Sequence, residues 1–167
     1  ALSERYRVYA IDRLGDIGRS TYLRPLRSAA DVVENLDELR SALQLGTGIR
    51  LMGLSYGGWE AAEYALAHPE RLARVVLIAP VATLFNLPPS FAWRGLLLLL
   101  PYRGFVEGMM RWSLPHLGTA ADEASRNRFD SLVDDAYLGM RSFDLRQAAI
   151  PRVLSDEQLA SIRPPTL

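Results

Sequence analysis

The stretch IRLMGLSYGGW (residues 49–59) combines an apolar run, a Gly-x-Ser-x-Gly motif and the start of a helical pattern. A strand followed at once by this motif and a helix is typical of a nucleophile elbow, in which a strained turn exposes the serine hydroxyl. We therefore predict Ser55 as a candidate nucleophile, with the Tyr56 backbone N–H at the helix N-terminus as a candidate oxyanion donor. Side chains at Gly53 and Gly57 would collide with neighbouring backbone, whereas Gly58 lets the helix pack close to the strand.

Two other interpretations of this stretch are less favoured. A chance match to the motif in a chain of this length has a frequency on the order of one in twenty, and Ser55 would then be a bystander in a glycine-rich turn. A phosphate-binding loop needs a lysine after its last glycine, but Trp59 and Glu60 follow here and the chain contains no lysine. The flanking strand and helix favour the elbow.

Composition excludes several classes of protein. The 167 residues suffice for one domain with a sizeable core, and 49% hydrophobic with 23% charged residues is ordinary for a globular protein. Nineteen basic residues, all of them arginine, balance nineteen acidic ones, so no nucleic-acid partner is indicated. No cysteine is present, the two histidines lack metal-ligand spacing, and no apolar run approaches the length of a membrane span.

The order of elements predicts an α/β fold with a parallel sheet. Residues 6–11 alternate like a strand, and a helix is expected from Ser28 as N-cap, with Asp31 completing a capping box. After the helix that follows Ser55, the apolar run 74–80 resembles a strand buried on both faces, which gives the order β-α-β-α-β over residues 6–80. Residues 85–150 contain helical patterns only. A short capped helix around residues 154–159 and the entry to another strand at 164–167 follow.

These features together resemble the α/β-hydrolase fold, in its serine esterase and lipase-like group with a helical cap. The resemblance rests on the Gly53–Gly58 motif, on the His68-Pro69-Glu70-Arg71-Leu72 path into the next strand, and on the loop with Asp12, Gly15, Gly18 and Ser20. The family's loop usually reads Asp-x-x-Gly-x-Gly-x-Ser, and here one extra residue separates the two glycines. The resemblance implies a partial α/β-hydrolase core at residues 1–84, a helical cap insertion at 85–150, and a return to the core at 151–167.

The resemblance also implies that the chain is the central fragment of a longer enzyme. In this fold the catalytic acid and histidine follow the nucleophile in that order, and both are expected beyond Leu167. The first strands, with the loop that donates the second oxyanion N–H, are expected before Ala1. We therefore expect residues 1–167 by themselves to be inactive and to fold poorly, because unpaired sheet edges invite aggregation.

Other residues inside the chain are weaker candidates for catalysis. No aspartate lies between Ser55 and His116, and Glu107 belongs to the cap, so His116 is disfavoured as the base. His68 ends the elbow helix roughly 18 Å from Ser55 and is interpreted as a C-terminal helix residue. The pair Asp134 and Asp135 fits a solvated helix face better than acid–base chemistry.

Two further sets of residues are assigned from their types. Asp12 and Asp16 are expected to shape their loop through side-chain hydrogen bonds. Four apolar residues of the cap, together with Met110, could line a substrate pocket, although packing of a cap helix on the core explains each of them at least as well; the four are Phe91, Trp93, Met109 and Trp112.

The sequence thus predicts a carboxylesterase that acts on small apolar esters through an acyl-enzyme on Ser55, with a small-molecule ester as substrate. No cofactor is implied, histidine spacing indicates no metal and net charge indicates no nucleic-acid partner, and we expect a soluble, cytoplasmic protein without a membrane span. A non-catalytic binding or scaffold protein of the same fold is the alternative from another class. Thioesterase, lactonase, acyltransferase and haloperoxidase-like activities share the same elbow, and the sequence leaves substrate and oligomeric state open.

Overall fold

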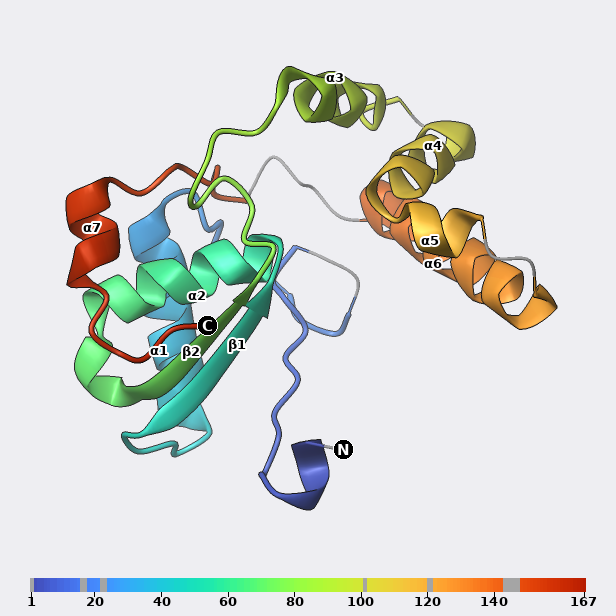
Figure 1. The fold of residues 1–167 in the computed structure, drawn as a ribbon. Helices are drawn as coiled ribbons and strands as arrows, with labels where there is room; N and C mark the ends of the chain where they lie inside the picture. The colour runs from blue at the N-terminus through green and yellow to red at the C-terminus, as the bar shows by residue number, and fades with distance from the viewer. Residues whose placement is uncertain (1, 16–17, 22–23, 101, 120–121, 143–147) are drawn as a thin grey trace. The chain divides into compact units, whose positions relative to one another are not determined.

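The computed structural model describes residues 2–15, 18–21, 24–100, 102–119, 122–142 and 148–167 (Figure 1). Asp16 lies outside these residues. The chain divides into two compact units, one formed by Pro25–Pro89 with Ala148–Leu167, and the other by Ala1–Arg24 with Ser90–Gln147. We call them the sheet unit and the helical unit and describe each by itself.

The sheet unit is built on two parallel strands, β1 (Ile49–Leu54) and β2 (Leu72–Ile78), whose register pairs Leu51 with Val75. Helix α2 (Tyr56–Ala67) and the short 3₁₀ turn η2 (Pro69–Arg71) connect them, as a parallel pair requires. The final residues run parallel to β2: the Val75 N–H donates to the Pro165 carbonyl (3.0 Å), and a bridge joins Val75 to Thr166. The predicted entry to a further strand is therefore confirmed.

Two capping boxes define helix starts in the sheet unit. Helix α1 (Ala29–Ala42) begins with the predicted reciprocal pair, in which the Ser28 hydroxyl accepts from the Asp31 N–H and the Asp31 carboxylate accepts from the Ser28 N–H. Helix α7 (Asp156–Ser161) begins in the same way with Ser155 and Gln158. Each helix start is fixed by two reciprocal hydrogen bonds between the side chains and backbone N–H groups of residues three positions apart.

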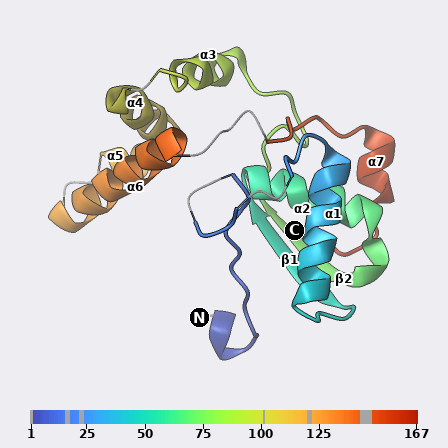
Figure 2. The same cartoon turned by 180° about the vertical axis from the view of Figure 1, so that it is seen from behind.

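Small residues on α2 allow this helix to pack closely between the two strands and α1. This helix lies against both strands and α1 packs on α2, as the two opposite views show (Figures 1 and 2). The buried core between the helices and the sheet contains Ala61, Tyr64, Ala65, Leu72 and Val75. On β1, Met52 and Leu54 alternate with more buried residues and are 56% and 64% exposed.

The predicted strand over residues 6–11 is wrong. After the short 3₁₀ turn η1 (Leu2–Glu4), residues 7–13 have no regular secondary structure, and Val8 and Ile11 are about half exposed (53% and 48%). Alternation of β-forming residues reports a preference for extended backbone, but a strand also needs a hydrogen-bonded neighbour. Within the described residues, strand pairing joins only β1, β2 and the segment around Thr166.

The expected loop role of Asp12 is confirmed. Its carboxylate accepts from the Arg19 N–H (2.9 Å), and its carbonyl accepts from the Ser20 hydroxyl (2.7 Å). These bonds link the two ends of the loop. They explain Asp12 as a structural residue without assigning it a role in catalysis.

The helical unit contains α4 (Arg103–Ser113), α5 (Pro115–Gly118) and α6 (Glu123–Ser142), together with most of α3 (Pro89–Leu97). A small core of Val106, Phe129 and Val133 joins α4 to α6, and Met110 packs against it. As expected, the described part of residues 85–150 has helices and no strand. The boundaries at residues 84 and 150 stay predictions. In the described part of the chain, no helix is both long and apolar enough to cross a membrane.

Candidate functional site

Ser55 stands at the junction of β1 and α2 in a backbone conformation that residues with a side chain rarely adopt. Its φ is 53° and its ψ is −114°, and the residue is exposed. A non-glycine residue held there costs about 1–3 kcal/mol, so the surrounding structure must enforce the geometry. The strained backbone predicted for this serine is present.

The enforcement comes from four backbone hydrogen bonds to Ser55. Its N–H donates to the Ile78 carbonyl at the end of β2 (2.9 Å). Its carbonyl accepts from the N–H groups of Gly58 (3.0 Å), Trp59 (3.2 Å) and Val81 (3.0 Å). The turn is therefore fastened to β2, to the first turn of α2 and to the loop after β2. None of these bonds uses the serine hydroxyl.

The loop after β2 also contains non-glycine residues with positive φ. Ala79 and Ala82 flank Val81 closely and have φ values of 44° and 45°, in the left-handed region. Among the described residues, these two alanines and Gln44 are the non-glycine residues other than Ser55 with positive φ. Unusual backbone is thus concentrated where the loop meets Ser55.

The glycines around Ser55 differ in what they require. A Cβ on Gly53 would lie 2.0 Å from the Gly57 carbonyl oxygen, so a side chain there is excluded by backbone. A Cβ on Gly58 would lie 2.9 Å from Pro80, in agreement with the predicted close approach of helix and strand. The prediction for Gly57 is wrong, because a Cβ there meets no described atom within 4 Å apart from its chain neighbours and the nearby backbone of its own helix. The Cβ position of Gly53 faces the backbone of the first turn of α2, whereas that of Gly57, the second residue of α2, faces open space.

Tyr56 is the first residue of α2, so its N–H is one of the four at the N-terminus that have no acceptor within the helix itself. These groups carry the positive end of the helix dipole, which favours a developing negative charge. The Tyr56 side chain makes two contacts of its own. Its hydroxyl donates to the Ala149 carbonyl, and its ring packs edge to face on Trp59 with the ring centroids 5.3 Å apart. No signal in the sequence pointed to this link, which spans 93 positions.

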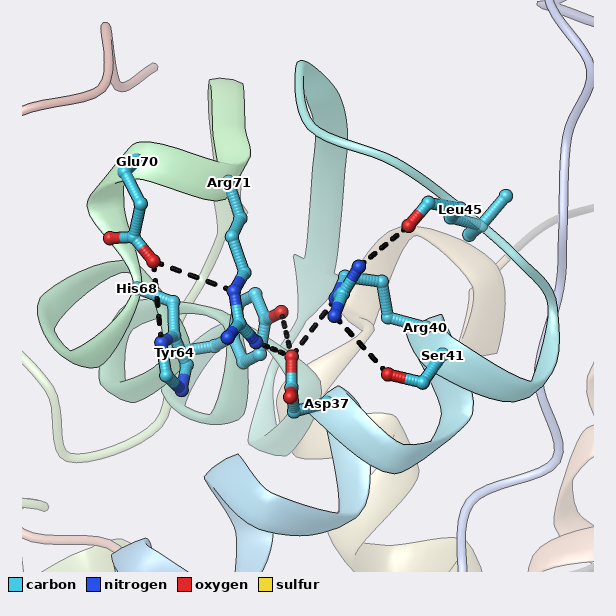
Figure 3. Close-up of polar contacts among 8 residues, drawn as sticks. All are labelled: Asp37, Arg40, Ser41, Leu45, Tyr64, His68, Glu70 and Arg71. Atoms are coloured by element: carbon cyan, nitrogen blue, oxygen red, sulfur yellow. Dashed lines mark hydrogen bonds and ion pairs between the residues drawn. The ribbon is translucent and has the colours of Figure 1, made fainter.

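At the other end of α2 lies a cluster of polar and charged side chains (Figure 3), which we call the Asp37 cluster: Asp37, Arg40, Tyr64, His68, Glu70 and Arg71. Asp37 accepts from Arg40 Nε (2.9 Å) and the Tyr64 hydroxyl (3.0 Å), and forms an ion pair with Arg71. His68 Nδ1 lies 3.5 Å from Glu70, and its ring contacts Tyr64 at 5.3 Å.

The place of His68 in this cluster agrees with its interpretation as a C-terminal helix residue. Helix α2 has 12 residues, which at 1.5 Å per residue separate His68 from Ser55 by roughly 18 Å. That distance excludes proton transfer between the two side chains.

In the helical unit two acidic residues, Glu107 and Asp134, form ion pairs with arginines. Glu107 forms ion pairs with Arg103 (3.3 Å) and Arg111 (2.8 Å), and Asp134 accepts from Arg103 Nε (2.6 Å). These contacts along and between α4 and α6 fit the solvated helix face predicted for Asp134. His116 is exposed on α5. Within the described residues, no group of three or more acidic or histidine side chains could hold a metal ion.

The structure brings together part of the predicted pocket set. The rings of Phe91 on α3 and Trp112 on α4 lie 6.1 Å apart, and the guanidinium of Arg94 lies 5.2 Å from the centroid of Trp112. Trp93 is 62% exposed. Met109 is half-buried, and its neighbour Met110 belongs to the core between α4 and α6. A pocket lined by the four predicted residues stays a prediction.

Comparison with known proteins places these features in a family. The profile of the Alpha/beta hydrolase family matches residues 1–167. Carboxylesterase YbfK of Bacillus subtilis is 28% identical to this chain over its whole length, and the match covers 55% of YbfK. The crystal structure of carboxylesterase CesB (YbfK) from Bacillus subtilis superimposes with a TM-score of 0.79 at 26% identity, covering 99% of this chain and 56% of that one. A protein of Oryza sativa subsp. japonica named "Probable 1-acylglycerol-3-phosphate O-acyltransferase" is 35% identical over 66% of this chain and 26% of its own length. The chain therefore spans about half or less of the length of these relatives. The match over the whole chain shows that it belongs to the alpha/beta hydrolase family.

Proposed function

We propose that this chain carries the nucleophile of a carboxylesterase that acts on small, mostly apolar esters. The observation that carries the proposal is the backbone of Ser55, held with φ 53° by hydrogen bonds from three directions while the residue stays exposed. A bystander serine has no reason to occupy a conformation that costs about 1–3 kcal/mol. The same cost argues against a purely structural scaffold that keeps this turn.

In the proposed reaction, Ser55 Oγ attacks the ester carbonyl carbon. The Oγ–C bond forms as an imidazole base takes the hydroxyl proton, and the carbonyl oxygen becomes an oxyanion that accepts from the Tyr56 N–H. The tetrahedral intermediate then collapses with cleavage of the C–O bond to the alcohol, which leaves with the proton from the imidazolium. Water repeats the sequence on the acyl-enzyme, releases the acid and restores the serine.

The base and its acidic partner are proposed to come from segments outside residues 1–167. His68 is excluded by its place at the far end of α2, and His116 follows Ser55 without an aspartate between them. In this fold the acid and the histidine follow the nucleophile along the chain. The inactivity of residues 1–167 by themselves stays a prediction on the same ground.

An acyltransferase is the second candidate, favoured by the name of the rice relative. Both reactions share the acyl-enzyme and differ in the acceptor, which is water in one case and an alcohol in the other. The esterase relative matches the whole chain, including the helical unit, whereas the rice relative matches 66% of it. The wider match favours hydrolysis.

The test uses Ser55→Ala in the protein expressed from its natural gene, with a chromogenic short-chain aryl ester as substrate. We expect turnover to fall by about 10⁴-fold or more, because the nucleophile is lost. A fluorophosphonate should label the unmodified protein at Ser55 and fail to label the variant. Ser41→Ala, an exposed serine on α1, is the matched control and should keep full turnover.

Unchanged turnover in Ser55→Ala would overturn the proposal. Labelling of Ser55 without release of acid, together with acyl transfer to an added alcohol, would favour the acyltransferase. Absence of both labelling and turnover in the unmodified protein would favour the non-catalytic alternative.

A further inference from the structure

The residue after the candidate nucleophile is fastened through its side chain as well as its backbone. The Tyr56 hydroxyl donates to the carbonyl of Ala149, a residue that is 2% exposed. A buried carbonyl that loses its donor costs free energy, so this bond holds both partners in place. The edge-to-face contact with the fully buried Trp59 fixes the ring at a second point.

Residues 149–154, which include the acceptor Ala149, are also linked to Ser55 through the loop after β2. Five residues after Ala149, the Leu154 N–H donates to the carbonyl of Thr83 (3.0 Å), and Thr83 is fully buried. Two residues before Thr83, the Val81 N–H donates to the carbonyl of Ser55 (3.0 Å). Hydrogen bonds and chain thus form a closed circuit that begins at Ser55 and ends at Tyr56.

A third contact supports the middle of the circuit. Arg152 Nε lies 3.5 Å from Oε1 of Glu63, whose side chain is 6% exposed on α2. Residues 149–154 are therefore tied to the start of α2, to its middle and to the loop after β2. The Ser55 carbonyl and the Tyr56 N–H belong to one peptide group, so the circuit holds this group from the Ser55 side through Val81 and from the Tyr56 side through the hydroxyl.

We propose that Tyr56 is a positioning residue, whose side-chain hydrogen bond to Ala149 holds its own backbone N–H in the direction that the oxyanion requires. This inference rests on the proposed function. Hydrogen-bond donors stabilise a transition state through their preorganised direction, so even a small shift of the Tyr56 N–H reduces the catalytic effect before the fold is lost. Binding of the ground-state ester depends less on this direction.

The chain offers a matched control on the same helix. Tyr64 also lies on α2 and also donates its hydroxyl to a residue outside the helix, in this case Asp37 at 3.0 Å. Tyr56→Phe and Tyr64→Phe each remove one hydroxyl and keep the ring. The two variants differ in which end of α2 loses its bond.

The experiment compares both variants in the protein expressed from its natural gene. For Tyr56→Phe we expect kcat on an aryl ester to fall about tenfold with KM changed less than about twofold, and the Ki of a trifluoromethyl ketone analogue to rise about tenfold. For Tyr64→Phe we expect a lower melting temperature with kcat and Ki unchanged. Tyr56→Leu should lose more than Tyr56→Phe, because the ring contact with Trp59 is lost too.

Equal effects of Tyr56→Phe and Tyr64→Phe on kcat and Ki would overturn the inference, as would a loss in Tyr56→Phe confined to KM or melting temperature. The Ser55→Ala variant distinguishes a failure of the positioning role from a failure of the proposed function. If Ser55→Ala abolishes turnover while Tyr56→Phe changes nothing, the positioning role fails and the proposed function stands. If Ser55→Ala keeps turnover, the proposed function fails first.

Discussion

At its N-terminal end α2 starts from an exposed serine in a left-handed conformation, fixed by backbone hydrogen bonds to β2 and the loop after it. At its C-terminal end the same helix is joined to α1 and η2 by the side chains of the Asp37 cluster. Backbone bonds at the first end enforce a conformation that costs free energy, whereas the second end satisfies its charges with opposite charges. The first end fits the proposed role of Ser55, and the second end stabilises the packing of α2 on α1 and η2.

Among substitutions at the two ends of α2, Gly53→Ala should have the largest effect. The new Cβ would overlap the Gly57 carbonyl oxygen, which is backbone and cannot move without displacing α2. We expect the free energy of unfolding to fall by about 3 kcal/mol or more, measured by urea denaturation.

Gly57→Ala is the control for that change. Its Cβ would meet open space inside a helix, so stability should stay the same or rise, by up to about 1 kcal/mol. Equal losses in the two variants would show that helix α2 is not seated on β1 as described.

Asp37→Ala tests the other end of α2. Removing the carboxylate leaves Arg40, Tyr64 and Arg71 without their shared acceptor, and we expect a loss of about 2 kcal/mol in the free energy of unfolding. The kcat on an aryl ester should stay within about twofold of the unmodified value. A tenfold fall in kcat at full folding would mean that the two ends of the helix are coupled.

The smallest expected effect is a pH dependence at Tyr64. Burial raises the pKa of its phenol, and the positive charge of Arg40 lowers it in part. Since the folded state holds the proton more tightly than the unfolded state, the contribution to stability is complete below the ordinary tyrosine pKa of about 10 and is lost as pH rises through the folded-state value.

The measurement is urea denaturation of the unmodified protein and of Tyr64→Phe between about pH 8 and about pH 11. Stability should fall more steeply with pH in the unmodified protein than in the variant. Parallel curves would mean that Tyr64 titrates alike in the folded and unfolded states.

Features encoded within a few residues could be predicted from the sequence. The Ser28–Asp31 capping box, the strained turn at Ser55 and the close approach at Gly58 each depend on neighbours in the chain or on one flanking strand. The family followed from the motif together with its strand and helix. Local patterns therefore sufficed for the elements around the candidate nucleophile.

Three features that depend on a partner or on a direction in space were predicted wrongly or missed. Residues 6–11 have strand-like alternation, but no sequence pattern supplies the neighbouring strand. Gly57 looked equivalent to Gly53 in the motif, and only the direction of each Cβ relative to the backbone separates them. The bond from Tyr56 to Ala149 joins residues too far apart for any spacing rule.

The pairing of Val75 with Thr166 has a consequence for how the chain folds. These residues lie about ninety positions apart, and the entropy lost on closing a loop grows with the logarithm of its length, so this contact is slow to form from an open chain. Helices α4 to α6 lie within that loop and have a small core of their own. If they form first, fewer residues remain free in the loop, and the ordering of the helical unit then speeds the last step of sheet assembly.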